Sequence, residues 1–153
     1  MKRMVLSTLT VLVLLAGPAH ANDKDSAVLV NMFVWWNSAF KQENGFTEEA
    51  FAKYFTADSV MIINGRERVR GIKAMARHFR DIQSQTDEVE IILPFIESFS
   101  KDGKTFTYHK VRARTGDQES YELVMGWAEI RAGRISLINF LSVSPTPEDQ
   151  NGK

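Results

Sequence analysis

Hydrophobic side chains recur at helical spacing in three stretches of the chain, at residues 26–42, 47–55 and 72–82. The first stretch ends in a polar run that contains Gly45, and the second begins at Thr47, a residue type that caps helices. Asp58 lies in the turn expected after the second stretch. The apolar faces consist of Val28, Met32, Trp35 or Trp36, Ala39 and Phe40, then Phe51, Tyr54 and Phe55, then Ile72, Met75, Ala76, Phe79 and Ile82. The pattern predicts three helices.

The hydrophobic period changes to two at residues 60–63, a run rich in β-branched residues. Asn64-Gly65 is a strong signal for a two-residue hairpin, and the charged residues 66–70 fit a return strand at a sheet edge. From residue 88 onward, turn signals divide the chain into four long strands. We expect them near residues 88–99, 105–114, 119–131 and 134–143. Long consecutive strands predict an antiparallel meander that twists and curves.

The first 21 residues have the three parts of a secretory signal. Two basic residues precede an apolar run at 5–16, and Ala19-His20-Ala21 provides small residues for cleavage after Ala21. A membrane-spanning helix needs about 20 apolar residues, which exceeds this run. The sequence therefore predicts a signal peptide at 1–21, a domain at 22–144 and a disordered tail at 145–153. The mature protein is expected to be exported, periplasmic or secreted, without membrane attachment.

The charges argue against several classes of partner. Removing Lys2 and Arg3 from 19 basic residues leaves 17 against 19 acidic ones, a net charge near −2 with the two signs interspersed. Such a charge distribution does not indicate the basic patch with which proteins bind nucleic acid or an anionic membrane. The chain has no cysteine and no His-x-x-x-His or Glu-x-x-His spacing, so the sequence predicts neither a metal site nor a disulfide. No motif indicates a cofactor.

The order of elements between Phe46 and Phe79 runs helix, Ala-Asp turn, hairpin, glycine and helix, followed by the predicted meander. This order resembles the nuclear transport factor 2-like superfamily, especially its SnoaL-like and ketosteroid-isomerase-like members. The resemblance implies an α+β fold in which a cone-shaped, curved antiparallel (mixed) sheet wraps around three N-terminal helices. It also implies a ligand cavity at the open end of the cone and a homodimer formed through the outer sheet face.

The resemblance does not carry over the catalytic residues of a ketosteroid isomerase. Asn64 stands where those enzymes have a carboxylate base, and an amide does not accept a proton at neutral pH. Trp36 falls near the family's oxyanion-hole tyrosine, and Met125 near its carboxylic acid. The histidine–carboxylate pairs of scytalone dehydratases and the Asp-Arg-Asp group of limonene epoxide hydrolases are not visible either. A steroid isomerase is therefore not predicted.

The family's inward position at Met125 implies that Tyr121, Leu123, Met125 and Trp127 face the cavity. On the preceding strand Phe106, Tyr108, Lys110, Arg112 and Arg114 would then face inward, and Arg112 would require Glu97 or a ligand carboxylate. In the opposite arrangement these cations cover a solvated outer face, with Val111 and Ala113 packed inward. The candidate ligand-binding residues are Trp36, Tyr54, Asn64, Tyr108, Arg112, Met125 and Trp127. Against a binding role, Asn64 can serve the hairpin alone and the aromatic residues can belong to the core.

Three functions fit these observations. In the first, the exported SnoaL-like domain binds a small, largely apolar or carboxylate-bearing molecule without a cofactor. The second is a cofactor-free isomerase, hydratase or cyclase with a non-standard site. The third is an interaction module that dimerises through the sheet and fills its own cavity. A homodimer is compatible with all three.

Overall fold

The computed structural model describes residues 23–145. The predicted signal peptide and residues 146–153 of the predicted tail lie outside this range. The three predicted helices are α1 (Asp23–Phe40), α2 (Glu48–Ala52) and α3 (Ile72–Gln83). The strands are β1 (Phe55–Ile63), β2 (Arg66–Arg70), β3 (Glu88–Ile91), β4 (Glu97–Lys101), β5 (Lys104–Thr115), β6 (Gln118–Arg131) and β7 (Arg134–Val143). None of the helices in this range combines the length and the apolar character that crossing a membrane requires.

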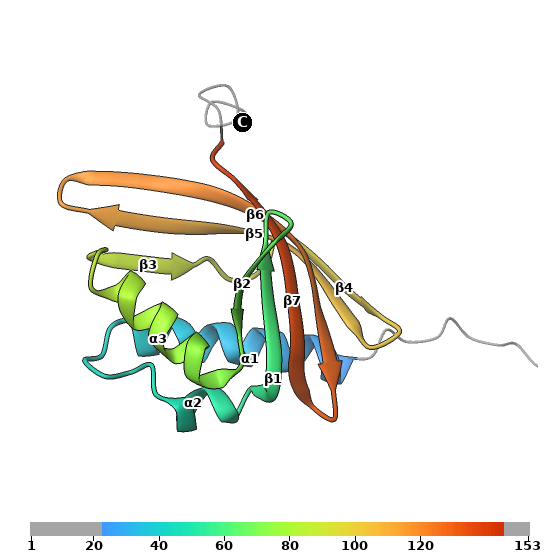
Figure 1. The fold of residues 1–153 in the computed structure, drawn as a ribbon. Coiled ribbons are helices and arrows are strands. Elements are labelled where there is room, and N and C mark those ends of the chain that lie inside the picture. The colour runs from blue at the N-terminus through green and yellow to red at the C-terminus, as the bar shows by residue number, and fades with distance from the viewer. Residues whose placement is uncertain (1–22, 146–153) are drawn as a thin grey trace, which may run out of the picture.

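The seven strands form one mixed sheet in the order β2-β1-β7-β6-β5-β3, and β4 also pairs with β5. The β1–β7 pair is parallel, and the other pairs are antiparallel. The long β5–β6 hairpin curves away from the helices at one end (Figure 1). The three helices lie on one side of the curved sheet, with α1 running across its concave face (Figure 1). The predicted α+β architecture is confirmed.

Two predicted boundaries were wrong. The strand expected at 88–99 is two strands, β3 and β4, which pair with opposite halves of β5 and are separated by a connection containing the cis Leu93–Pro94 bond. Asp58 is not in a turn after the second helix. It lies exposed within β1, whose register against β7 shifts between Phe55 and Val60. The pattern of apolar residues did not show where these strands begin and end, because pairing with a neighbouring strand decides the ends of a strand.

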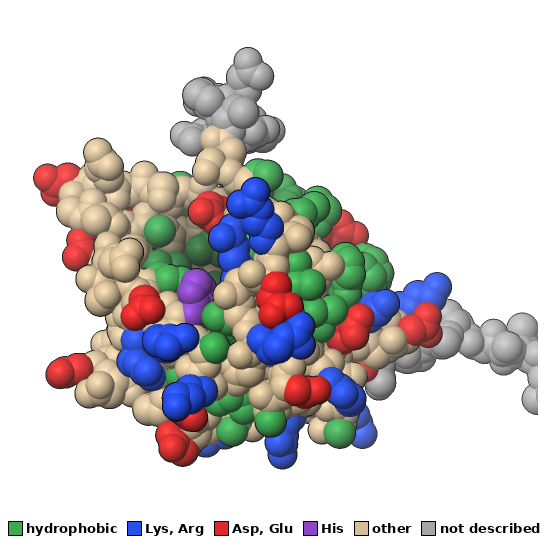
Figure 2. All heavy atoms as spheres, viewed as in Figure 1, with side chains coloured by type: hydrophobic (Ala, Val, Ile, Leu, Met, Phe, Trp, Pro, Cys, Tyr) green, Lys and Arg blue, Asp and Glu red, His purple; other side chains and the backbone are tan. Residues whose placement is uncertain are grey.

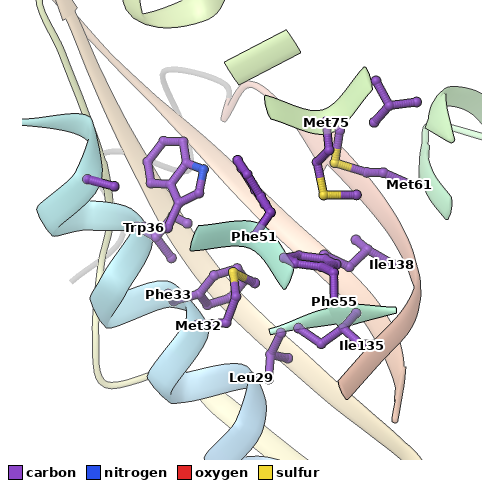
Figure 3. Packing of buried hydrophobic residues seen from close by; sticks show 14 of the residues in the cluster. Leu29, Met32, Phe33, Trp36, Phe51, Phe55, Met61, Met75, Ile135 and Ile138 are labelled. Atoms are coloured by element: carbon purple, nitrogen blue, oxygen red, sulfur yellow. The ribbon is translucent and has the colours of Figure 1, made fainter. Parts of the chain in front are cut away.

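The core lies between α1 and the sheet. Leu29, Met32, Phe33 and Trp36 project from α1 toward a layer that includes Phe55, as Figure 3 shows. The same buried cluster includes Phe51 of α2, Met61 of β1, Met75 of α3, and Ile135 and Ile138 of β7 (Figure 3). Burying a large apolar side chain contributes about 1.5–3 kcal/mol, so this layer supplies much of the energy that orders α1 on the sheet.

The short helix α2 is held by its cap and by aromatic contacts. The Ala50 N–H donates to Thr47 Oγ1 at 3.1 Å, so the predicted N-cap is confirmed. Phe51 is fully buried, and its ring stacks on Phe79 of α3 at 5.7 Å. A helix of five residues is too short to be stable alone, and these tertiary contacts therefore fix it.

The side chains of β5 and β6 point in the opposite directions to those inferred from the family's position at Met125. Thr105, Thr107 and His109 are buried toward the helices, whereas Met125 is 56% exposed. Side chains alternate along a strand, so an offset of one residue exchanges the two faces completely. The inward placement of Phe106, Tyr108, Lys110, Arg112 and Arg114, and of Tyr121, Leu123, Met125 and Trp127, is therefore wrong. The opposite arrangement, with the cations on the outer face and Val111 toward the helices, is confirmed.

Candidate functional site

A cavity of about 260 Å³ lies between the helices and the concave face of the sheet. Figure 2 shows hydrophobic side chains in the recess between α3 and the β5–β6 hairpin. The cavity is lined by Met32, Phe33, Trp36, Phe55, Met61, Ile63, His78, Phe79, Ile82, Val89, Ile91, His109, Val111, Glu122, Val124, Ile138, Phe140 and Ser142. Most of these side chains are aliphatic or aromatic, so the wall favours an apolar occupant.

His109 lies deep in this wall among aromatic rings. Its side chain is 1% exposed, and its ring centroid lies 5.3 Å from Phe33, 5.5 Å from Phe95 and 5.6 Å from Phe140. Burial lowers the pKa of His109 to about 4, because the charged imidazolium would lose its hydration. The imidazole is therefore neutral at pH 7, and its Nδ1 is buried without a hydrogen-bond partner among the described residues.

Trp36 contributes a second unpartnered polar atom to the same wall. The side chain is buried, with its ring close to Phe40, Phe46 and Phe79 at 5.3–5.5 Å. Its indole Nε1 has no hydrogen-bond partner among the described residues. Buried polar groups in native proteins are nearly always hydrogen-bonded, but within the described chain Thr56, Ser59, Thr107 and Trp127 also carry a buried polar atom without a partner. The cavity thus has an apolar wall, behind which the nitrogens of Trp36 and His109 are buried without a partner among the described residues.

The remaining polar groups are closer to solvent. Glu122 is exposed, and its carboxylate accepts a hydrogen bond from Ser142 Oγ. His78 of α3 is half-buried, and the pKa of His78 is lowered, chiefly because burial disfavours its charged form. The lining residues within 23–145 include one carboxylate and neither lysine nor arginine. An anionic ligand would therefore find no compensating cation of these types in the wall.

Trp36 is the one predicted site residue that the structure places in the cavity wall. Tyr54 follows α2 outside the lining, where its ring stacks on Trp35 at 5.0 Å. Asn64 adopts a φ of 54° in the hairpin, and its side chain bonds the backbone of Ser142 at 2.8 and 3.0 Å. The positive φ agrees with the interpretation that Asn64 serves the hairpin, and its amide also ties the hairpin to β7.

Tyr108, Met125 and Trp127 lie on the outer face of the sheet. They line a second, open hollow of about 580 Å³. Its other lining residues are Gly65, Glu97, Ser98, Phe99, Phe106, Thr107, Gly126, Asn139 and Leu141. The sheet therefore separates these three residues from Trp36, and a molecule in the inner cavity does not contact them.

Arg112 also lies on the outer face, away from the cavity. Its guanidinium Nη2 donates to Glu88 at 2.8 Å and to Glu90 at 2.7 Å, and Nη1 donates to Glu119 at 3.4 Å. The hydrogen bond to Glu90 is the largest cause that raises the pKa of Arg112. The predicted partner Glu97 is not among these carboxylates. The guanidinium of Arg112 is thus paired with three carboxylates of the protein itself, so it does not need the carboxylate of a ligand as its partner.

The reversed faces explain why His109 was missed as a site residue. On β5 one face carries Lys110, Arg112 and Arg114, whereas the other carries Thr107, His109 and Val111. A face with three cations is difficult to bury, and this charge pattern could have identified the inward face. Glu122 reaches the mouth of the cavity because it shares the inward face of β6 with Val124.

Two of the three positions that the resemblance assigns to steroid-isomerase catalysis lie outside the cavity lining. Asn64 bonds the backbone of β7, and Met125 points to the outer face. Within residues 23–145, histidine and carboxylate side chains nowhere gather in a group of three that could hold a metal ion.

No protein-family model and no curated protein matches this sequence. Solved structures do match its fold. A putative SnoaL-like polyketide cyclase from Jannaschia sp. CCS1 is 9% identical, with a TM-score of 0.65 over 84% of this chain and 91% of the other. An NTF2-like protein from Exiguobacterium sp. 255-15 is 17% identical, with a TM-score of 0.60 over 77% and 98%. An LEH-like epoxide hydrolase from M. tuberculosis is 18% identical, with a TM-score of 0.59 over 78% of each chain.

These similarities confirm the predicted NTF2-like fold, and at such low identity they show the fold alone. The similar structures include a cyclase and a hydrolase by name, so the shared architecture does not select one activity. The function has to be argued from the cavity and its residues.

Proposed function

We propose that this domain binds a small, largely apolar molecule in the inner cavity, without a cofactor. The observation that carries the proposal is the predominantly apolar wall around about 260 Å³ of space. This volume is slightly below the roughly 300–1,000 Å³ of typical small-molecule pockets, which favours a compact ligand. Arg112 supported a carboxylate-bearing ligand in the sequence, but its place on the outer face removes that support.

Bicyclic hydrocarbons such as tetralin are suitable probes. A ligand that binds only the folded state stabilises it by about 2.7 kcal/mol at 100 times its Kd, which thermal unfolding detects. We expect a concentration-dependent rise in Tm and a saturable isothermal titration. If neither tetralin nor its ketone 1-tetralone binds to the mature protein, the proposal is contradicted.

Two neighbouring positions on β6 provide a matched pair of variants. Val124 is 5% exposed and lines the cavity, whereas Met125 points outward. Val124→Phe places additional volume in the cavity and should abolish probe binding. Met125→Phe adds a ring on the opposite face and should leave probe binding unchanged. Equal effects of the two substitutions would locate the probe elsewhere.

A second candidate function is dimerisation through the outer face of the sheet. Phe99, Met125, Leu141 and Val143 are each more than half exposed on the described chain. Figure 2 shows hydrophobic side chains gathered over β4, β6 and β7. Contiguous exposed apolar surface of this kind commonly marks an interaction site. Light scattering should give the mass of a homodimer, and Leu141→Lys should give a monomer; a wild-type monomer at all concentrations would contradict this candidate.

Cofactor-free catalysis has weaker support. The carboxylate in the cavity lining is Glu122, which is exposed at the mouth and bonded to Ser142. An isomerase, hydratase or cyclase would use this group as its acid or base. The apolar wall supports binding without requiring any such role.

Export of the domain is also part of the proposal. The signal at residues 1–21 should be removed on secretion, so that the mature chain begins at Asn22. N-terminal sequencing of protein from the periplasm or medium tests this expectation. Full-length protein retained in the cytoplasm would contradict it.

A further inference from the structure

We propose that the mouth of the inner cavity binds the carboxylate of an amphipathic ligand through Arg66 and Arg68 of β2, while the apolar part of the ligand fills the cavity. This inference rests on the proposed function and specifies the ligand class. Neither lysine nor arginine is among the described lining residues, so a carboxylate can meet a cation of these types only at the rim. β2 pairs with β1, whose Met61 and Ile63 line the cavity, and therefore lies at that rim.

The pairing of β1 with β2 places Arg66 on the cavity side of the sheet. Ile63 lies directly opposite Arg66, and residues directly opposite each other in an antiparallel pair share a face. Because Ile63 lines the cavity, the side chain of Arg66 starts beside that lining. Arg66 is exposed, so its guanidinium is accessible to a charged group at the mouth.

A β-bulge directs Arg68 to the same side. The register shifts between Met61 and Ile62 of β1, and Arg68 is the residue of β2 that has no counterpart in the pairing. A bulge breaks the alternation of side chains, so Arg68 shares the cavity side with its buried neighbour Val69. Burial chiefly lowers the pKa of His78, and the positive charge of Arg68 lowers it further, so Arg68 lies near a residue that lines the cavity.

Both guanidiniums of the proposed site are available to a ligand. Neither forms an ion pair or a side-chain hydrogen bond with the described residues. Arg77 and Arg134 are also unpaired within the described chain, so the position beside the cavity distinguishes the two cations of the site. Arg70 of the same strand is different, because it donates to Glu67 at 2.6 and 3.0 Å.

The balance of charges at the mouth favours a single negative charge on the ligand. Glu122 is the carboxylate in the described lining, and it accepts a hydrogen bond from Ser142. Arg66 and Arg68 therefore exceed it by one positive charge, which an ionised carboxylate neutralises. Figure 2 shows basic side chains and a histidine bordering the hydrophobic recess, so one molecule can reach both the apolar wall and the cations.

Two probes of nearly the same shape isolate the effect of the charge: tetralin-1-acetate and its uncharged amide. The Kd of each is measured by isothermal titration against the mature protein at pH 7 and low ionic strength. We expect the acetate to bind more tightly than the amide by about 1.4- to 5-fold for each ion pair that forms. In about 1 M salt, where the screening length falls to about 3 Å, this preference should largely disappear.

Four single substitutions test the site. Arg66→Gln and Arg68→Gln each remove one cation at the mouth, and at least one of them should reduce the preference for the acetate by about 1.4- to 5-fold. Arg70→Gln is the control, because it removes the same charge from the same strand. Arg70 pairs with Glu67, which lies on the side of the sheet away from the cavity, so the preference should be unchanged. Glu122→Gln removes the opposing carboxylate and should increase the preference.

Failures of this inference and of the proposed function are distinguishable. If tetralin, 1-tetralone and both new probes fail to bind, the proposed function and this inference fall together. If tetralin binds but the acetate has no advantage over the amide, only this inference is overturned. Equal losses in Arg68→Gln, Arg66→Gln and Arg70→Gln also overturn it, because the net charge of the protein would then attract the acetate. The salt dependence of the wild type tests the ion pairs without any substitution.

Discussion

Acidification should destabilise this protein through His109, and the effect can be isolated by comparison with His109→Leu. His109 is buried among Phe33, Phe95 and Phe140, and burial lowers its pKa to about 4 from an ordinary value of 6.5. Leucine has a similar volume, fits the apolar surroundings and does not titrate. The difference between the two proteins therefore reports the protonation of this imidazole.

The sign follows from which state binds the proton. In the unfolded chain His109 is protonated below pH 6.5, whereas in the folded protein it stays neutral until about pH 4. The unfolded state binds more protons between these values, so stability is complete above pH 6.5 and falls as the pH decreases toward 4. The pKa difference of about 2.5 units corresponds to about 3.4 kcal/mol at most, of which about 3 kcal/mol is lost at pH 4.

Urea unfolding followed by tryptophan fluorescence measures the free energy of unfolding of both proteins at pH 7 and pH 4. Both proteins retain Glu122 and His78, the other titratable groups that line the cavity. Their protonation contributes to both curves and cancels in the difference. The free energy of the wild type should fall by about 3 kcal/mol more than that of His109→Leu.

A difference between the two proteins that stays within about 0.5 kcal/mol across this pH range would refute the reasoning. It would mean that the folded protein accepts the proton as readily as the unfolded chain does. His109 would then have access to water or to an acidic partner, and the inference that burial keeps its imidazole neutral would be wrong.

Four further substitutions test the described contacts. Asn64→Ala removes two hydrogen bonds to Ser142 and places alanine at a positive φ, so urea unfolding should show a loss of about 1–2 kcal/mol; an unchanged free energy would contradict this. Gly126→Ala would bring a Cβ to 2.1 Å from a backbone oxygen, and should cost about 3 kcal/mol. Gly133→Ala meets no atom within 4 Å, so by the same assay it should cost only about 1 kcal/mol of backbone strain, and equal losses would refute the steric argument. Arg112→Ala should leave the Kd for 1-tetralone unchanged in titration, because its ion pairs lie on the outer face, and a loss of affinity would place Arg112 near the ligand.

Local signals predicted most of the elements. Thr47 caps α2, and Asn64 with Gly65 turns the β1–β2 hairpin through two residues of positive φ. Each signal acts over a few residues, so the sequence contains the complete interaction. The break between β3 and β4 was not predicted, because both strands pair with β5 and that pairing is not local.

The alternation of side chains along a strand does not by itself show which face of the sheet points toward the helices. A strand with period two has two possible orientations, and the resemblance at Met125 led to the wrong one for β5 and β6. Identities of 9–18% with the similar structures are compatible with a shift of one position, which moves every side chain to the opposite face. The cations of β5 favoured the correct orientation, but only the buried Thr107 and His109 decided it.

The sequence by itself determined most of the order of the elements, because helix periodicity, caps and turns are encoded locally. The cone-shaped architecture was implied by the family resemblance that this order carries. Only the tertiary structure decided which residues form the candidate site. Trp36 and His109 are far apart in the chain, and packing of α1 on the concave sheet brings both to one cavity. The same packing excludes Arg112 and Met125, since a strand can direct only alternate side chains toward the helices.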